Sequence, residues 1–313
     1  MGPLYTVSNK CALAVVLAFL ALQVHRAATA PVSTGEAYLY DRFVRPATRE
    51  VLAAGLPDRD VLYSLLEKRS VGLLHVSPFS VRLPSLLFGI LALFAVWRLA
   101  MRGFKTAWGG VILALAAATS WAGGWFVKAD GTGAAMALLV CAVWLAWERR
   151  YLNLIGICLG LSIAAKVGFW LPALFLALAI LWYWKQWWEW IDRVAIPASV
   201  VVVILLAVPA SHAGAPAENP PQLAGGQTAH LRSALDALRA DAGTKPIRIA
   251  TVPSAEPIVN FYRAQHRANN WQRALLAGSA GHFDYYLIPS GDSVRAGELV
   301  YRDADFAVVR AAL

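Results

Sequence analysis

The sequence predicts a mainly α-helical membrane protein, a polytopic bundle of about seven transmembrane helices followed by a small C-terminal α/β domain. Two observations predict the bundle. Hydrophobic residues make up 58% of the 313 residues and charged residues only 15%, whereas soluble domains carry about 25% charge. Long apolar runs also alternate with short basic clusters. The α/β domain is predicted by alternating strand and helix patterns near the C-terminus.

The first apolar run, residues 11–24, has two interpretations. With Lys10 before it and Ala28-Thr29-Ala30 after it, the run resembles a signal peptide with a cleavage site. The alternative is a retained first span. We favour the retained span because His25 and Arg26 lie where a cleavage region is usually uncharged.

Six further apolar runs follow, several of them shorter than the ~20 residues that a perpendicular helix needs to cross a bilayer. They are 83–99, 106–126, 132–147, 152–165, 168–184 and 194–208. The stretch 152–184 could be one long interrupted segment. We interpret it as two spans because Lys166 and Pro172 interrupt it, and this gives seven helices.

The net charge of +9 belongs almost entirely to the membrane part. Its basic residues cluster in alternate short loops: Arg98, Arg102 and Lys105; Arg149 and Arg150; Lys185 and Arg193. The positive-inside rule makes these loops and the N-terminus cytoplasmic, so that the loop 25–82 and the chain after Ser211 face outward. Because apolar spans separate the basic clusters, we do not expect nucleic acid as a partner.

We therefore expect three parts. Residues 1–211 form the transmembrane domain, including the outer loop 25–82, and 212–226 form a linker rich in Ala, Pro and Gly. Residues 227–313 form a small soluble α/β domain on the outer face. Its predicted helices contain Leu231, Leu235 and Leu238, then Ile258, Phe261 and Tyr262, and its predicted strands are 247–252, 283–288, 298–301 and 307–310.

Three stretches of the chain carry a resemblance to a known family. They are Gly35-Glu36-Ala37-Tyr38, the stretch 76–89 from Val76-Ser77-Pro78 to Phe88-Gly89, and Gly160-Leu161-Ser162-Ile163-Ala164-Ala165-Lys166 with Pro172 after it. Together they resemble the GT-C membrane glycosyltransferases, in particular the bacterial branch that contains protein mannosyltransferases and aminoarabinose transferases. Members of that family move a sugar from a polyprenyl-phosphate donor to an acceptor on the outer membrane face. The resemblance implies a GT-C-like bundle in the bacterial cytoplasmic membrane, with a polyprenyl-phosphate-linked sugar as its partner.

The chain departs from the family pattern at three points. Gly35 replaces the usual Asp of an Asp-Glu pair, Asp58-Arg59-Asp60 replaces Asn-Asn-His, and Asp130-Gly131-Thr132 replaces Arg-Gly-Tyr. The chain is also shorter than many members. A second reading therefore stays open, a non-catalytic relative that acts as a membrane scaffold or as the subunit of another membrane protein. A transporter is disfavoured because no half of the chain is repeated.

The resemblance implies Glu36 as the catalytic base, with Asp41 or Asp60 assisting. A carboxylate at a low-dielectric interface has a raised pKa and can take a proton from an acceptor hydroxyl. The alternative is that Glu36 is an ordinary loop acid or pairs with Arg42 or Arg45.

Four further charged residues are candidate substrate-binding groups. Arg82 and Lys166 would hold the donor phosphate, since guanidinium and ammonium groups bind phosphate oxygens. Equally, Arg82 could anchor its helix and Lys166 could extend to the interface. Lys128 and Asp130 either form an interfacial ion pair or face the same cavity as Glu36.

A divalent metal is an optional cofactor, held by Asp58 and Asp60, because hard cations prefer carboxylate oxygens. The alternative is that both are solvated loop acids. We predict no other cofactor, and Cys11, Cys141 and Cys158 lie within apolar runs without the spacing of a metal site.

Overall fold

The computed structural model describes most of the chain in two units. The described residues are 3–46, 60–104, 127–148, 151–184, 225–276, 282–292 and 297–311, with the single residues 111, 113, 115, 124, 194, 198 and 223. The helical unit comprises Met1–Thr29, Ala47–Leu74 and Phe79–Pro216, and the C-terminal unit comprises Ala30–Pro46, His75–Pro78 and Ala217–Leu313. Two short pieces of the predicted outer loop are thus grouped with the C-terminal unit.

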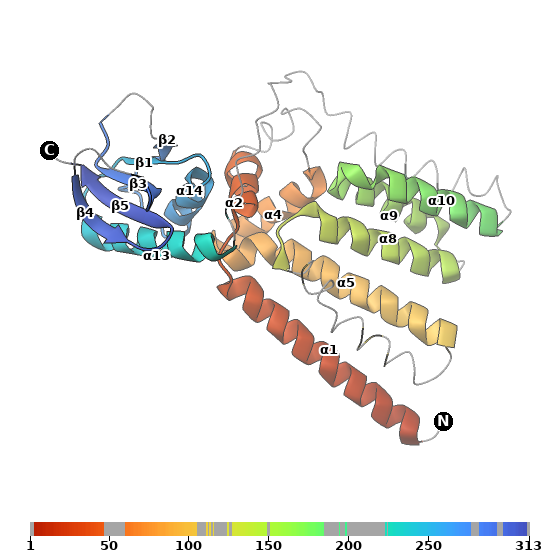
Figure 1. Ribbon diagram of the computed structural model, residues 1–313. Coiled ribbons are helices and arrows are strands. Elements are labelled where there is room, and N and C mark those ends of the chain that lie inside the picture. The colour runs from red at the N-terminus through yellow and green to blue at the C-terminus, as the bar shows by residue number, and fades with distance from the viewer. Residues whose placement is uncertain are drawn as a thin grey trace. The chain divides into compact units, whose positions relative to one another are not determined.

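The helical unit contains six described α-helices (Figure 1). They are α1 (Pro3–Thr29), α4 (Val61–Leu74), α5 (Pro78–Phe104), α8 (Gly131–Glu148), α9 (Leu152–Ala165) and α10 (Trp170–Trp184), with the short 3₁₀ turn η2 (Val167–Phe169) between the last two. Helix α4 lies within the predicted outer loop 25–82.

Two described helices are long and apolar enough to cross a membrane, Pro78–Met101 of α5 and Gly131–Glu148. A third is added if Leu13–Thr29 and Thr34–Val44 count as one broken span. Helices α9 and α10 are apolar but shorter. Most of the predicted spans 106–126 and 194–208 lies outside the described residues, so the count of seven stays a prediction.

Helices α5 and α8 run in the same direction. Near the start of α5, the Ser85 hydroxyl donates to the Lys128 carbonyl just before α8, at 2.6 Å. At the other end, Arg98 of α5 binds Glu148, the last residue of α8, at 2.8 Å. The end of α5 and the start of α8 therefore lie at opposite ends of the pair.

Apolar side chains of α8, α9 and α10 form the largest described core of this unit. Its members include Leu139, Ala142, Leu145, Ile155, Leu159, Ala173, Ala177 and Ile180. Small alanines let the helices approach closely, which is how membrane helices associate where lipid offers no hydrophobic driving force.

Pro84 inside α5 has a partner on α4. A proline has no N–H, so the carbonyl four residues earlier, that of Ser80, loses its helical hydrogen bond. The Ser70 hydroxyl of α4 donates to that same carbonyl at 2.5 Å. A carbonyl group without a hydrogen bond destabilises the fold in an apolar surrounding, and the hydrogen bond from Ser70 prevents this destabilisation.

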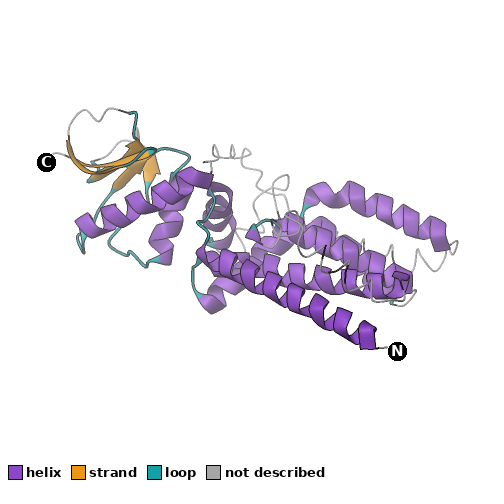
Figure 2. Ribbon diagram, turned by 60° about the horizontal axis from the view of Figure 1, so that its bottom comes forward, coloured by secondary structure: helices purple, strands orange, loops and turns teal. Residues whose placement is uncertain are grey.

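The C-terminal unit is a small sheet with helices. Its elements are α2 (Thr34–Leu39), the π-helical turn η1 (Tyr40–Val44), α13 (Gly225–Ala242), β1 (Ile249–Thr251), α14 (Glu256–Gln265), β2 (Leu275–Leu276), β3 (Tyr285–Pro289), β4 (Gly297–Arg302) and β5 (Phe306–Ala311). The strand order is β2-β1-β3-β5-β4, with β1 parallel to β2 and β3, and β5 antiparallel to β3 and β4. Figure 2 shows the helices of this unit on one side of the sheet.

Helix α13 supplies the core side chains that its leucine spacing predicts. Leu231, Leu235 and Leu238 are fully buried, and α13 packs against β4 and β5. The strand residues Ile249 and Leu287 are buried with them. The described residues thus form a mainly helical fold with one small mixed sheet, as the sequence predicts.

Candidate functional site

The structure brings Asp60 and Lys166 together, two residues that the sequence singles out. Asp60 lies directly before α4, and its carbonyl accepts the N–H of Ser64, the first such bond of that helix, at 2.8 Å. Its side chain points to other helices instead. Oδ2 accepts the N–H of Gly131 at 2.8 Å and lies 3.5 Å from Nζ of Lys166.

The charges of this pair suit the helix ends on which they lie. Gly131 is the first residue of α8, where unpaired N–H groups favour a carboxylate. Asp130 adds a second acid there, accepting the Thr132 N–H at 3.0 Å. Lys166 directly follows α9, and a cation is favourable at a helix C-terminus.

Gly131 permits this close approach. A Cβ atom at this position would lie 1.9 Å from the Ala165 carbonyl oxygen and 2.8 Å from Cγ of Asp60. The start of α8, the end of α9 and the Asp60 carboxylate therefore meet at a point that only glycine fits.

Burial raises the pKa of Asp60 above the ordinary value of 3.8, and the nearby Asp130 adds to this rise. Lys166 and the Gly131 N–H act in the opposite direction but do not outweigh burial. A carboxylate with a raised pKa is a stronger base. Both described hydrogen bonds to it end on Oδ2, so among the described contacts Oδ1 is the oxygen left for a substrate.

Helix α4 carries polar side chains on its buried face and several leucines among its exposed residues. The buried residues along it and just before it are Asp60, Tyr63, Ser64, Glu67 and Ser70. The exposed leucines are Leu66, Leu73 and Leu74, and Arg69 is the exposed charged residue between them. This is the reverse of a surface helix in a soluble protein, and it suits a helix with lipid outside and a polar site inside.

A hydroxyl pair on α4 and α5 holds the segment that carries Lys128 and Asp130. The Tyr63 hydroxyl lies 2.9 Å from Oγ of Ser85, which in turn donates to the Lys128 carbonyl. The sequence left open whether Lys128 and Asp130 form an ion pair, and the described contacts contain no such pair. Instead, the Lys128 carbonyl accepts the Ser85 hydroxyl, and the Asp130 carboxylate accepts the Thr132 N–H.

Arg82 is 2% exposed and lies on α5. Its Nη1 donates to the Ala27 carbonyl in the last turn of α1, at 3.2 Å. An arginine at the end of a helix satisfies a carbonyl that has no helical partner. This contact supports the anchoring role for Arg82, while phosphate binding stays a prediction.

Glu36 and Asp41 belong to the C-terminal unit, and both have structural partners there. Glu36 is 6% exposed and forms a capping box, in which its Oε2 accepts the Ser33 N–H at 2.8 Å and its own N–H donates to Oγ of Ser33 at 3.3 Å. Asp41 binds Arg45 at 3.0 Å and Arg273 at 2.5 Å. The Ser-x-x-Glu pattern at Ser33 is the sequence signal that could have predicted the cap.

The described residues do not offer a site for a divalent metal. No group of three or more His, Cys, Asp or Glu side chains with suitable geometry occurs among them. Asp60 is paired with an ammonium group rather than with a second carboxylate, and Asp58 lies outside the described residues. A metal at Asp58 and Asp60 stays a prediction.

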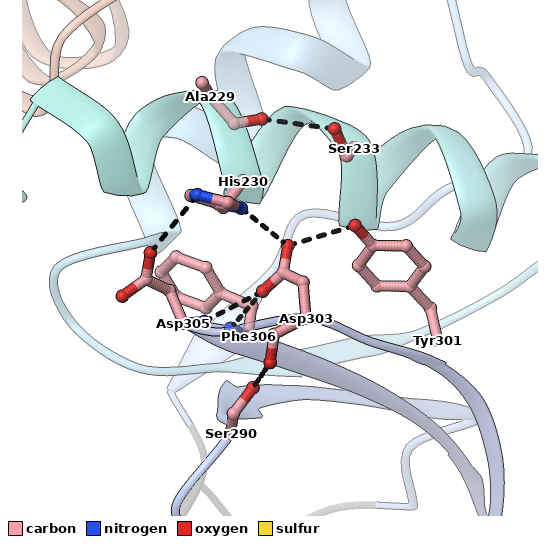
Figure 3. A network of polar contacts seen from close by, with 8 residues as sticks. All are labelled: Ala229, His230, Ser233, Ser290, Tyr301, Asp303, Asp305 and Phe306. Carbon is pink, nitrogen blue, oxygen red and sulfur yellow. Dashed lines mark hydrogen bonds and ion pairs between the residues drawn. The ribbon is translucent and has the colours of Figure 1, made fainter.

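A second polar cluster closes the β4–β5 hairpin onto α13 (Figure 3). Oδ2 of Asp303 lies 3.2 Å from Nδ1 of His230 and accepts the Tyr301 hydroxyl at 3.0 Å. Its Oδ1 accepts the backbone N–H groups of Asp305 and Phe306. Asp303 thus uses both oxygens to fix the turn, and we assign this cluster to stability.

The chain matches no protein-family model, and comparisons with curated proteins and with solved structures gave no significant match. The resemblance to the GT-C glycosyltransferases therefore rests on the quoted residues alone.

Proposed function

We propose that the protein is a membrane glycosyltransferase that transfers a sugar from a polyprenyl-phosphate donor to an acceptor hydroxyl. The observation that carries the proposal is the ion pair between the buried Asp60 and the partly exposed Lys166, where α4, α8 and α9 meet. It supplies a base and a cation next to each other, and both lie at the ends of apolar helices.

In the proposed reaction, Asp60 replaces Glu36 as the base. Asp60 accepts the proton of the acceptor hydroxyl, whose oxygen attacks the anomeric carbon of the donor. The bond from that carbon to the phosphate oxygen breaks, and the configuration of the sugar is inverted. The polyprenyl phosphate leaves with the bonding electrons, and Lys166 stabilises the added negative charge.

The polar face of α4 adds support. A sugar needs hydroxyl and carboxylate partners, and the buried side chains of α4 are of these types. The leucines on its other face suit contact with the lipid chain of a donor. We assign the reaction to the outer face because Asp60 and Gly131 lie at helix starts, whereas in the sequence the basic clusters follow the helix ends, which the positive-inside rule predicts to be cytoplasmic.

A second candidate function is a non-catalytic scaffold or partner subunit. It is favoured by the structural partners of the predicted acids, since Glu36 caps α2, Asp41 binds two arginines and Asp60 ties three helices together. In that case the Asp60–Lys166 pair contributes only to stability.

Two variants of Asp60 distinguish these functions. The transfer of labelled sugar from a polyprenyl-phosphate donor is measured with the full chain in nanodiscs. Asp60→Asn keeps an acceptor for the Gly131 N–H but removes the base, and we expect the rate to fall ~10²–10⁴-fold. In the double variant Asp60→Asn/Lys166→Met neither partner leaves an unpaired charge, so we expect recovered thermal stability without recovered transfer.

Two controls complete the experiment. Asp292→Asn, at an exposed turn of the C-terminal unit, should transfer sugar at the wild-type rate. Glu36→Gln should also fold, because glutamine suits the same position of a capping box. If folded Glu36→Gln loses transfer while Asp60→Asn keeps full transfer, the catalytic base is Glu36 and not Asp60. Absence of transfer by the wild-type chain with every donor would favour the scaffold.

A further inference from the structure

Three arginines gather on one side of the C-terminal unit. Arg45 and Arg273 both bind Asp41, and their side chains are 40% and 55% exposed. Arg263 of α14 lies near both of them. Glu256 is a second acid close by, so within the part of the chain that the structure describes we count two carboxylates beside these three guanidinium groups.

Helix α14 fixes the segment that carries Arg273. The Asn260 side-chain oxygen accepts the N–H of Ala274 at 3.1 Å, and Arg263 donates to the Trp271 carbonyl at 3.2 Å. Asn260 and Arg263 lie three residues apart, on one face of the helix. Residues 271–274 are therefore held against α14, and the position of Arg273 does not depend on a free loop.

Asp41 offsets the mutual repulsion of the three arginines only in part. Burial lowers the pKa of Arg263, and Arg45 and Arg273 lower it further, against the opposing effect of Asp41. An anionic group placed among the three arginines would relieve this repulsion, because charges this close interact strongly near a protein surface.

Two leucines extend from the same segment. Leu275 and Leu276 form β2, the edge strand of the sheet, and they are 46% and 41% exposed. Consecutive strand residues point to opposite faces, so the two leucines lie on either side of this edge, two and three residues after Arg273. Exposed leucines close to arginines are typical of surfaces that insert apolar side chains between charged lipid headgroups. The positive charge of the arginines close to these leucines favours an anionic lipid surface as the partner.

We propose that the arginine–leucine surface, made of Arg45, Arg263, Arg273, Leu275 and Leu276, docks on a bilayer that contains anionic phospholipids. The arginines bind headgroup phosphates and the leucines enter the interfacial region. The residues that directly follow the apolar helix α1 belong to the same unit, so the chain itself connects this surface to an apolar helix of the membrane part. This inference does not depend on the glycosyltransferase proposal.

A fluorescent probe at the edge strand tests the proposal in the full chain. Cys11, Cys141 and Cys158 are replaced by alanine, and Leu276→Cys is labelled with a nitrobenzoxadiazole dye. The protein is placed in nanodiscs of phosphatidylcholine alone or with phosphatidylglycerol, each doped with a nitroxide-labelled lipid. We expect strong quenching with phosphatidylglycerol, and loss of that quenching at about 0.5 M salt, where charges are largely screened.

Matched variants separate this surface from the rest of the sheet. Leu299→Cys carries the dye on β4, the opposite edge, where the leucine is 53% exposed, and we expect little quenching there. Arg45→Gln, which leaves Asp41 bound to Arg273, should weaken docking about fivefold. Arg248→Gln removes an exposed arginine elsewhere in the unit and should have no effect.

Three outcomes would overturn the proposal. The first is equal quenching at both edges. The second is quenching that is indifferent to phosphatidylglycerol and to Arg45→Gln. The third is a dye at Leu276→Cys already shielded in detergent without lipid, which would indicate a protein or a second copy of the chain on this surface. None of these outcomes bears on sugar transfer.

Discussion

At the scale of single residues, Gly131 shows how closely the helices approach at the Asp60 carboxylate. The backbone there leaves no space for a methyl group, since a Cβ atom would overlap the Ala165 carbonyl oxygen. The same position donates the N–H that orients Asp60. One glycine therefore serves both the packing of α8 on α9 and the geometry of the candidate site.

We predict that Gly131→Ala destabilises the helical unit by about 1–3 kcal/mol, because the clash involves backbone atoms that cannot turn aside. Gly72→Ala is the control. Gly72 lies within α4 with no atom within 4 Å of an added Cβ, so alanine should be neutral or stabilise that helix by up to about 1 kcal/mol. Thermal unfolding in detergent gives both values. Equal effects of the two substitutions would contradict the packing described for Gly131.

The residues of this site can be identified from the sequence, but the contacts between them cannot. Asp60 and Lys166 could be singled out because charged groups beside apolar runs are costly and need a reason. Their pairing could not be predicted, since 106 residues separate them and the contact depends on how α8 packs on α9. The ion pair between Asp41 and Arg273 spans 232 residues and was missed for the same reason. The cap formed by Glu36 is local, and Ser33 could have predicted it.

At the scale of elements, the β4–β5 hairpin depends on one carboxylate. Burial acts to raise the pKa of Asp303, but the backbone N–H groups of Phe306 and Asp305, helped by Tyr301 and His230, outweigh it and lower the pKa below 3.8. Since the unfolded chain binds the proton more tightly, the ionised form stabilises the hairpin. That contribution is present above about pH 4 and is lost as the pH falls through the folded pKa.

We predict that the hairpin opens in acid, and that Asp303→Asn weakens this pH dependence. Hydrogen exchange of residues 297–311 in the full chain, corrected for the intrinsic rate, is followed from pH 6 to pH 3. The wild type should lose protection below about pH 4, whereas Asp303→Asn should be less protected at pH 6 and change less. Glu298→Gln, on the same hairpin and with a side chain 71% exposed, should behave like the wild type. Identical pH profiles for wild type and Asp303→Asn would refute the prediction.

Elements with a strong local signal were the ones that the sequence could predict. The leucine spacing of α13 and the apolar α5 and α8 appear as expected. The reversed polarity of α4 was not predicted, because the same residues suit a helix lying on the interface. Which face of α4 is buried depends on its contacts, such as the bond from Ser70 to the carbonyl left free by Pro84.

At the scale of the whole molecule, the parallel direction of α5 and α8 has a consequence for topology. Both helices begin at the level of Lys128 and end at the level of Arg98 and Glu148. The ends of α5 and α8 therefore lie on the same side, and in the sequence basic residues occur at or directly after both ends: Arg102 and Lys105, and Arg149 and Arg150. By the positive-inside rule we predict that this side is cytoplasmic and that the helix starts, with Asp60 and Gly131, face outward.

We predict that a membrane-impermeant maleimide labels His75→Cys but not Tyr151→Cys in intact spheroplasts. His75 lies just before α5 and Tyr151 just after α8, and both are exposed, so a difference in labelling reports the side of the membrane and not burial. Alkaline phosphatase fused after Leu313 should be active in the same cells, because the C-terminal unit is predicted to face outward. Permeabilised cells, in which both cysteines should react, are the control. If only Tyr151→Cys reacts in intact cells and the fusion is inactive, the orientation is reversed, and the Asp60–Lys166 pair would face a cytoplasmic donor instead.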